Sequence, residues 1–290
     1  LGIQSVYDED LQFVKRGHSV QDSIESIQIL KDLGFKLNFH YMLGLTENEK
    51  KDLEGIKKLF SDPNFRPDMM KIYPCLVMPG TPLYNLYKQG KYKPITTEEA
   101  IEIISEAKRF IPEFCRIMRI QRDIPTKYTI AGPDRTNLRQ LVHERCKRLN
   151  IKCRCINCRE IKTNQIINPE LKVLEYEASK AKEFFISIED NDKLIGFCRL
   201  RFPSQFLRSE ITKDTALIRE LHVYSSLTNL GKEGHAQHKG FGIKLVKKAE
   251  EIAKENNKNK IVVISGVGVK EYYIKKLDYK KEGPYVSKLI

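Results

Sequence analysis

Residues 215–224 read TALIRELHVY, and residues 237–242 read QHKGFG. The first stretch is long and apolar, which is typical of a strand, and the second opens a helical pattern with Leu245, Val246, Ala249 and Ile252 on one face. A strand, a glycine turn and a helix in this order leave unpaired backbone N–H groups at the helix start, where the helix dipole favours a phosphate. Gly240 and Gly242 permit the close approach that a pyrophosphate needs.

Two kinds of phosphate-binding loop are compatible with a glycine turn of this sort. A Rossmann turn needs a third glycine and an acidic residue after the next strand, and neither is present. The loop instead resembles the acetyl-CoA loop of the GNAT acetyltransferases, Gln/Arg-x-x-Gly-x-Gly/Ala. This resemblance implies cofactor contacts from one strand and one loop: Glu220, Leu221, His222, Val223, Ala236, Gln237, His238, Lys239, Gly240 and Gly242.

Two tyrosines in EYYIKKL stand where GNAT enzymes commonly place the acid that protonates the departing thiolate. Tyr272 and Tyr273 are therefore candidate catalytic acids, and Tyr273 is also a candidate cofactor contact, although paired tyrosines on a short helix also serve as packing. Glu220 is either a general base or a surface carboxylate. His222 and His238 are weaker candidates that could equally pack or face solvent.

The first 121 residues alternate β-like runs with helical ones. The chain begins on the β-like run LGIQSV, and KLNFHYML, MMKIYPCLV and CRIMRIQ follow as predicted strands. Ser19 and Asp22 form a capping pair for a first helix, and helices are also predicted over residues 47–60 and 96–110. Such alternation predicts a parallel sheet with right-handed crossovers, and about eight units are needed to close a barrel. We expect the C-terminal part of a barrel whose front is missing.

After Pro125 the pattern changes twice. A helix-like NLRQLVHERCKRL and a compact cysteine-rich stretch come first, and then the chain turns β-rich, with a hairpin turn in IEDNDKLIG. The expected fold class is therefore α/β. We expect a partial TIM-like barrel over residues 1–125, a basic metal-binding linker over residues 126–165 and a GNAT-like domain with a mixed sheet over residues 166–290.

Four of the seven cysteines, Cys146, Cys153, Cys155 and Cys158, are spaced C-x6-C-x-C-x2-C. Zinc prefers four tetrahedral thiolates, which makes a structural zinc site the favoured interpretation, while an iron–sulfur cluster stays open. His143, one helical turn before Cys146, is the obvious substitute if one thiol is not a ligand. Cys75, Cys115 and Cys198 lie in apolar strand patterns and are expected in the core.

The charge of the chain is concentrated in one stretch. Of a net +13 over 290 residues, residues 135–162 carry nine Lys or Arg against two Glu. Such a concentration favours a nucleic-acid partner, although a solvated surface can also be this basic. No apolar run reaches the ~20 residues that a bilayer requires, and there is no secretory signal pattern. We therefore expect a cytoplasmic protein without membrane contact, and a piece of a longer chain.

Taken together, these motifs resemble the catalytic subunit of Elongator, the Elongator complex protein three family, in its archaeal form. The resemblance rests on LGIQSVYDEDL, KIYPCLVMPGTPLY, AGPDRTNLRQL, CRCINCREI, RELHVY, QHKGFG and ISGVGVKEYY and covers nearly the whole chain. It implies a radical-SAM barrel, a zinc-bearing linker and a GNAT-like domain that together act on the wobble uridine of tRNA anticodons. Accessory Elongator-type subunits are possible partners.

The family reaction implied by this resemblance joins the two catalytic domains. S-adenosylmethionine cleaved at a 4Fe-4S cluster yields a radical that takes hydrogen from the methyl group of acetyl-CoA, and the product is a carboxymethyluridine. Lys71 and Tyr73 match family residues that line the radical-SAM cleft. The C-x4-C-x9-C-x2-C cluster motif is absent from this sequence, so we expect no such cluster here.

Two other functions remain compatible with the GNAT pattern. One is a protein lysine acetyltransferase, such as one acting on histones, although cationic lysine tails favour an acidic groove rather than a basic one. The other is a non-catalytic tRNA-binding scaffold, against which the complete Gln237, Gly240 and Gly242 pattern argues.

Overall fold

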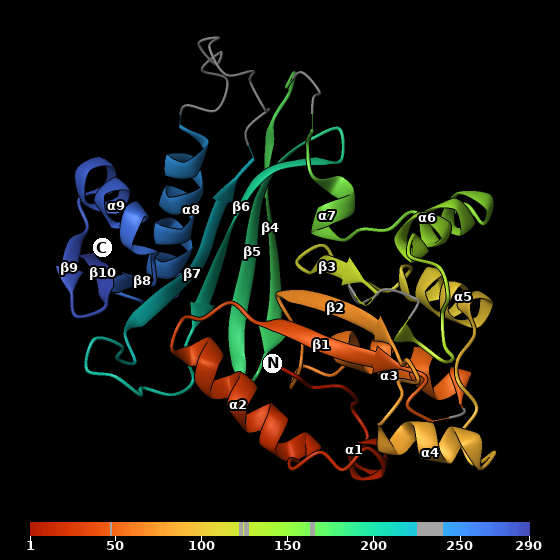
Figure 1. Ribbon diagram of the computed structural model, residues 1–290. Coiled ribbons are helices and arrows are strands. Elements are labelled where there is room, and N and C mark those ends of the chain that lie inside the picture. The colour runs from red at the N-terminus through yellow and green to blue at the C-terminus, as the bar shows by residue number, and fades with distance from the viewer. Residues whose placement is uncertain (47, 122–123, 125–127, 163–165, 225–239) are drawn as a thin grey trace. The chain divides into compact units, whose positions relative to one another are not determined.

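The computed structural model describes residues 1–46, 48–121, 124, 128–162, 166–224 and 240–290 (Figure 1). These residues form two compact units. Unit 1 comprises residues 1–25 and 37–158, and unit 2 comprises residues 26–36 and 159–290. The domain boundaries expected at residues 125 and 165 stay predictions.

Unit 1 contains a three-stranded parallel sheet in the order β1-β2-β3 among its described residues. The strands are β1 (Asn38–Leu43), β2 (Met69–Pro74) and β3 (Arg116–Ile120). Helices precede β1, lie between consecutive strands and follow β3. The helices are α1 (Asp8–Phe13), the first part of α2 (Val20–Asp32), α3 (Glu49–Ser61), α4 (Pro82–Lys88), α5 (Thr97–Ala107), α6 (Leu138–Arg148) and α7 (Ile156–Arg159), the last of which ends in unit 2.

One face of this sheet is apolar because buried and half-buried residues alternate along β1. Helix α3 packs on that face at Gly55, where an added Cβ would lie 1.9 Å from the Tyr41 hydroxyl. The side chain of Asn48 caps α3 by accepting from the Lys51 N–H. Strand–helix alternation therefore produces the parallel sheet that the sequence predicts.

The predicted strand at the start of the chain is reduced to a single bridge. Gln4 pairs with Tyr41 of β1 in parallel fashion, but its φ of 64° lies in the left-handed region and interrupts an extended strand. The short helix α4 was not predicted from the sequence. Its signal is Thr81, whose side chain accepts from the Tyr84 N–H, followed by a proline in the first turn.

Unit 2 contains a seven-stranded mixed sheet among its described residues, in the order β4-β5-β6-β7-β8-β10-β9. Helix α8 packs on β5, β6 and β7 (Figure 1). The elements are β4 (Glu170–Ala178), β5 (Ala181–Asp190), β6 (Lys193–Phe202), β7 (Thr215–Val223), α8 (Phe241–Glu255), β8 (Lys260–Val263), the 3-10 helix η2 (Val267–Val269), α9 (Lys270–Leu277), β9 (Lys280–Glu282) and β10 (Tyr285–Leu289).

The predicted hairpin turn of unit 2 is confirmed. Asn191 and Asp192 both have positive φ, 48° and 67°, which is the type of turn that joins two twisted strands most tightly. Strands β5 and β6 flank this turn and are buried along almost their whole length. The α/β class with a mixed sheet in this unit is thus as the sequence indicates.

In the part of the chain that the structure describes, no helix is both long and apolar enough to cross a membrane.

Candidate functional site

The candidate cofactor site lies where the pairing of two parallel strands, β7 and β8, ends. β7 pairs with β8 only from Thr215 to Ile218, and β7 then continues to Val223. The predicted cofactor-binding residues Glu220, Leu221, His222 and Val223 all follow this last pair. β8 ends at Val263, opposite Ile218, so β7 extends beyond its partner, and a strand edge of this kind can bind an extended ligand by strand-like pairing.

A β-bulge marks the same point. In the pairing of β6 with β7, Arg199 is opposite Glu220 and Leu200 is opposite Ile218, so Arg219 is the extra residue. A bulge bends its strand and increases the local twist. The bend therefore coincides with the end of the β7–β8 pairing.

The start of α8 faces this region. Gly240 is its N-cap, with a φ of 108° that L side chains rarely adopt and without a capping side chain. A Cβ added to Gly242 would lie 2.6 Å from the Tyr272 hydroxyl and 3.9 Å from Leu221. Glycine at this position thus brings the first turn of α8 against β7 and α9. The other predicted loop residues, Ala236, Gln237, His238 and Lys239, lie outside the described residues.

The two tyrosines of α9 occupy different surroundings. The Tyr272 hydroxyl lies at the first turn of α8, and partial burial raises its pKa above the usual value, so it stays protonated. Tyr273 is 3% exposed and packs edge-on against Tyr272 and Tyr279, with ring centroids 5.5 and 5.7 Å apart. Burial, with Cys198 nearby, raises the pKa of Tyr273 more strongly. The geometry favours Tyr272 as the acid and Tyr273 as a packing residue.

Glu220 is held by two cations. Its carboxylate accepts from Arg199 Nε at 2.9 Å and from Lys36 Nζ at 3.1 Å, and its side chain is 11% exposed. Both contacts engage the carboxylate oxygens with side chains of unit 2, and the role of Glu220 as a general base stays a prediction. His222 is exposed and lies against aromatic rings, 4.5 Å from Tyr224 and 5.9 Å from Phe197 by ring centroids.

Three of the four predicted metal ligands come together in unit 1. The sulfurs of Cys153, Cys155 and Cys158 all lie within 4.8 Å of one another. A tetrahedral zinc with Zn–S bonds of about 2.3 Å sets its sulfurs about 3.8 Å apart, so both spacing and donor chemistry fit this metal. Hydrogen bonds from Cys153 and Cys158 lower the pKa of the Cys155 thiol, which favours the thiolate that binds metal.

A buried lysine accompanies these sulfurs. Lys108 is 3% exposed, and its Nζ lies 3.8 Å from the sulfurs of both Cys153 and Cys158. Burial by itself lowers the pKa of Lys108, but the four neighbouring cysteines together raise it by more, so the pKa lies above its usual value. An ammonium here offsets the negative charge of several thiolates.

The fourth ligand stays a prediction. Cys146 on α6 is buried and is not among the three gathered sulfurs. His143 precedes it by one turn. Burial, with Lys108 and Arg139 nearby, lowers the pKa of His143 and favours the neutral imidazole, the form that binds metals.

Lys71 and Tyr73 lie two residues apart on β2 and therefore share one face of the sheet. His40 of β1 is on the same face, because it is in register with Lys71 and its ring meets that of Tyr73 edge-on at 5.4 Å. Met70 and Ile72, both fully buried, point to the other face. The two predicted residues thus stand together on the more polar side of this sheet.

Comparison with known proteins agrees with these two units. The Radical_SAM C-terminal domain model matches residues 67–148, and the Acetyltransferase (GNAT) family model matches residues 158–278. A solved structure of archaeal Methanocaldococcus infernus Elp3 with an N-terminal deletion is 46% identical and superposes with a TM-score of 0.94, covering 100% of this chain and 71% of that one.

The chain belongs to the Elongator complex protein 3 family. It is 47% identical to the tRNA uridine(34) acetyltransferase of Methanocaldococcus jannaschii and 39% identical to human Elongator complex protein 3. These alignments cover all of this chain but 56% and 55% of the relatives, so the chain spans about half the length of the curated proteins it matches. The resemblance to the Elongator family inferred from the motifs is confirmed, as is the combination of a radical-SAM part with a GNAT part.

The basic stretch of this Elongator-family chain is partly neutralised. Four of its arginines pair with acidic residues outside the stretch: Arg135 with Asp134, Arg145 with Glu102, Arg154 with Glu113 and Arg159 with Glu189. Arg159 is also 2% exposed, which removes it from any surface. The exposed cations Lys147 and Arg148 at the end of α6 remain candidates for contact with a polyanion.

Sequence reasoning missed the charged residues that hold β7 in place. Arg199 and Lys36 contact Glu220, Arg219 is the bulged residue and donates to the Phe35 carbonyl, and none of the three was singled out. A signal was present, because RELHVY and FCRLRF place arginines inside otherwise apolar strands, and buried charges require partners.

Proposed function

We propose that the chain is part of a tRNA uridine(34) acetyltransferase-type enzyme, which uses acetyl-CoA to build a carboxymethyl group on the wobble uridine of the anticodon. One observation carries the proposal. β7 leaves β8 after Ile218 at the point where α8 begins on glycine and the Tyr272 hydroxyl approaches. A strand edge that extends beyond its partner, beside a helix N-terminus, suits a carrier that has an extended arm and a diphosphate.

Each part of this site has a distinct task. The first turn of α8, with Gly240 and Gly242, would hold the diphosphate by backbone N–H groups together with residues 236–239 of the preceding sequence. Residues 220–223 of β7 would pair with the pantetheine arm. Tyr272 would donate a proton to the departing thiolate, for which its raised pKa keeps it in the acid form. Tyr273 would support Tyr272 by packing rather than by proton transfer.

The remaining cofactors belong to unit 1 and to the whole protein. S-adenosylmethionine and a 4Fe-4S cluster would supply radical chemistry, and we assign no cysteine of this chain to the cluster because none has its spacing. Lys71 and Tyr73 would face that chemistry from β2. Cys153, Cys155 and Cys158, with Cys146 or His143 as fourth ligand, would bind a structural zinc.

The proposed partner is the anticodon stem-loop of tRNA, held partly by exposed cations such as Lys147 and Arg148. None of the seven cysteines, all of which lie in the part of the chain that the structure describes, forms a disulfide, which fits the reducing cytoplasm that we propose as the location. Accessory Elongator-type subunits are a further proposed partner, since the animal relatives carry the name of that complex.

A tRNA titration tests this function. We expect tRNA to bind with an affinity that falls steeply between about 50 and 200 mM salt and to stimulate hydrolysis of the acetyl-CoA thioester. A lysine-rich histone-tail peptide serves as the control substrate and should not be acetylated. Acetylation of the peptide without any effect of tRNA would favour a protein lysine acetyltransferase instead.

A further inference from the structure

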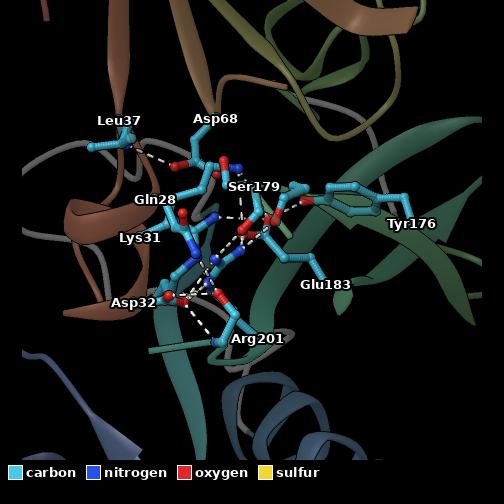
Figure 2. A network of polar contacts seen from close by, with 12 residues as sticks. Gln28, Lys31, Asp32, Leu37, Asp68, Tyr176, Ser179, Glu183 and Arg201 are labelled. Carbon is cyan, nitrogen blue, oxygen red and sulfur yellow. Dashed lines mark hydrogen bonds and ion pairs between the residues drawn. The ribbon is translucent and has the colours of Figure 1, made fainter. Parts of the chain in front are cut away.

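Residues 26–36 belong to unit 2, although the rest of that unit begins only at residue 159. They comprise the second half of α2 and the turn after it. Buried charges fix it to the sheet (Figure 2). Asp32 pairs with Arg201 at 2.7 Å, and Lys31 pairs with Glu183 at 3.3 Å. Arg201 also pairs with Glu183 at 2.8 Å, and the exposed fraction of all four side chains is at most 1%.

The same segment reaches the bulge of β7. Arg219, the bulged residue, donates from one guanidinium nitrogen to the Phe35 carbonyl at 2.7 Å and from another to Glu183 at 3.0 Å. The next residue along β7, Glu220, accepts from Lys36 at 3.1 Å. Two successive residues of β7 are thus held by two successive residues of the segment, at the point where β7 leaves β8.

We propose that residues 31–36 position residues 220–223 of β7, the part of the strand that would bind acyl-CoA. Lys36 and Arg219 are the positioning residues of that site. This inference rests on the proposed function. A shift of one residue in the pairing of a strand turns each side chain to the opposite face, so a bulge must be fixed if residues 220–223 are to present constant backbone groups. Phe35 and Lys36 fix it from outside the sheet.

Lys36 permits a clean test because its side chain is 52% exposed and its removal leaves the buried network intact. Lys182 pairs with Glu175 at 2.7 Å, is 42% exposed and lies in the same unit away from β7, which makes it a matched control. Coenzyme A is titrated calorimetrically into the wild-type chain and into the variants Lys36→Met, Lys36→Arg and Lys182→Met.

We expect Lys36→Met to weaken coenzyme A binding about two- to five-fold, which is the range of a partly exposed ion pair. Lys36→Arg should restore binding to within about two-fold, because it keeps the charge opposite Glu220. Lys182→Met should bind like the wild type. Equal affinities of Lys36→Met and the wild type, or an equal loss in Lys182→Met, would overturn the inference.

A charge exchange gives a second, independent test. Lys36→Glu and Glu220→Lys each place like charges together, and the double variant restores an opposite pair. We expect the double variant to bind coenzyme A at least about three-fold more tightly than Glu220→Lys alone, because these two variants share the loss of the Arg199–Glu220 pair and differ only at residue 36. Additive losses would contradict the positioning role. Failure of the wild-type chain to bind coenzyme A would overturn the proposed function as well, whereas binding that is insensitive to all variants would overturn this inference alone.

Discussion

Replacement of Asp32 by asparagine should strongly destabilise unit 2. The carboxylate of Asp32 is fully buried and accepts from Arg201 Nε at 2.7 Å. It also accepts from Ser204 Oγ at 2.8 Å, from the Ser204 backbone N–H at 3.2 Å and from the Gln205 N–H at 3.0 Å. Asparagine has a similar shape, so packing is preserved while the negative charge is lost.

The magnitude follows from the charges that remain. Without Asp32, the buried cations Lys31, Arg201 and Arg219 share the single carboxylate of Glu183. Loss of one partner from a buried ion pair typically costs about 3–5 kcal/mol. A unit of this size loses about 2–4 °C of melting temperature per kcal/mol, so the melting temperature of unit 2 should fall by roughly 10 °C.

Urea denaturation combined with hydrogen exchange of β5 and β6 measures this loss in unit 2 specifically. Glu175→Gln is the matched control, because Glu175 forms a largely exposed pair with Lys182 and its loss should cost at most about 1 kcal/mol. A loss below about 1 kcal/mol in Asp32→Asn would refute the conclusion that the network anchors residues 26–36 to the sheet.

Three further outcomes are expected. Tyr272→Phe should lower the rate of thioester hydrolysis about 100-fold relative to the wild type without a change in melting temperature. Tyr273→Phe should leave this rate within a few-fold of the wild-type rate. A large loss of rate in Tyr273→Phe and a small one in Tyr272→Phe would exchange the roles of the two tyrosines. Because burial raises the pKa of Asp52 to about 7, the folded state keeps a proton there that the unfolded chain loses near pH 3.8. The free energy of unfolding of the wild type should therefore fall as pH rises from about 4 to 7. At pH 8 urea titrations should show Asp52→Asn to be more stable than the wild type by up to about 4 kcal/mol. Lower stability of Asp52→Asn than of the wild type at pH 8 would contradict this. A zinc chelator should lower the melting temperature of the wild type but not that of Cys155→Ser, and equal sensitivity of the two would argue against a thiolate metal site.

Local patterns in the sequence predict much of the fold. The predicted capping pair is present, since Ser19 N and Oγ both donate to Asp22 at 2.7 Å. Asn191 and Asp192 form the predicted turn because short polar side chains tolerate positive φ. These features depend on residues only a few positions apart, and propensity and periodicity are sufficient to identify them.

The supports of the site depend on contacts that periodicity does not encode. Arg201 and Asp32 are 169 residues apart in the chain, and no local pattern pairs them. The bulge at Arg219 follows from the register of β6 with β7, which is fixed only when the sheet forms. Cys146 has suitable spacing for a metal ligand, yet the sulfurs that gather are those of the short turn from Cys153 to Cys158.

Hydrogen exchange of this chain with and without coenzyme A, in the presence of tRNA, tests the central claim most directly. The account predicts slower exchange in residues 219–223 of β7 and at the start of α8, residues 240–244, with no change in β1. Unchanged exchange in both segments, or protection confined to unit 1, would contradict the assignment of an acyl-CoA site to the part of β7 beyond the end of β8.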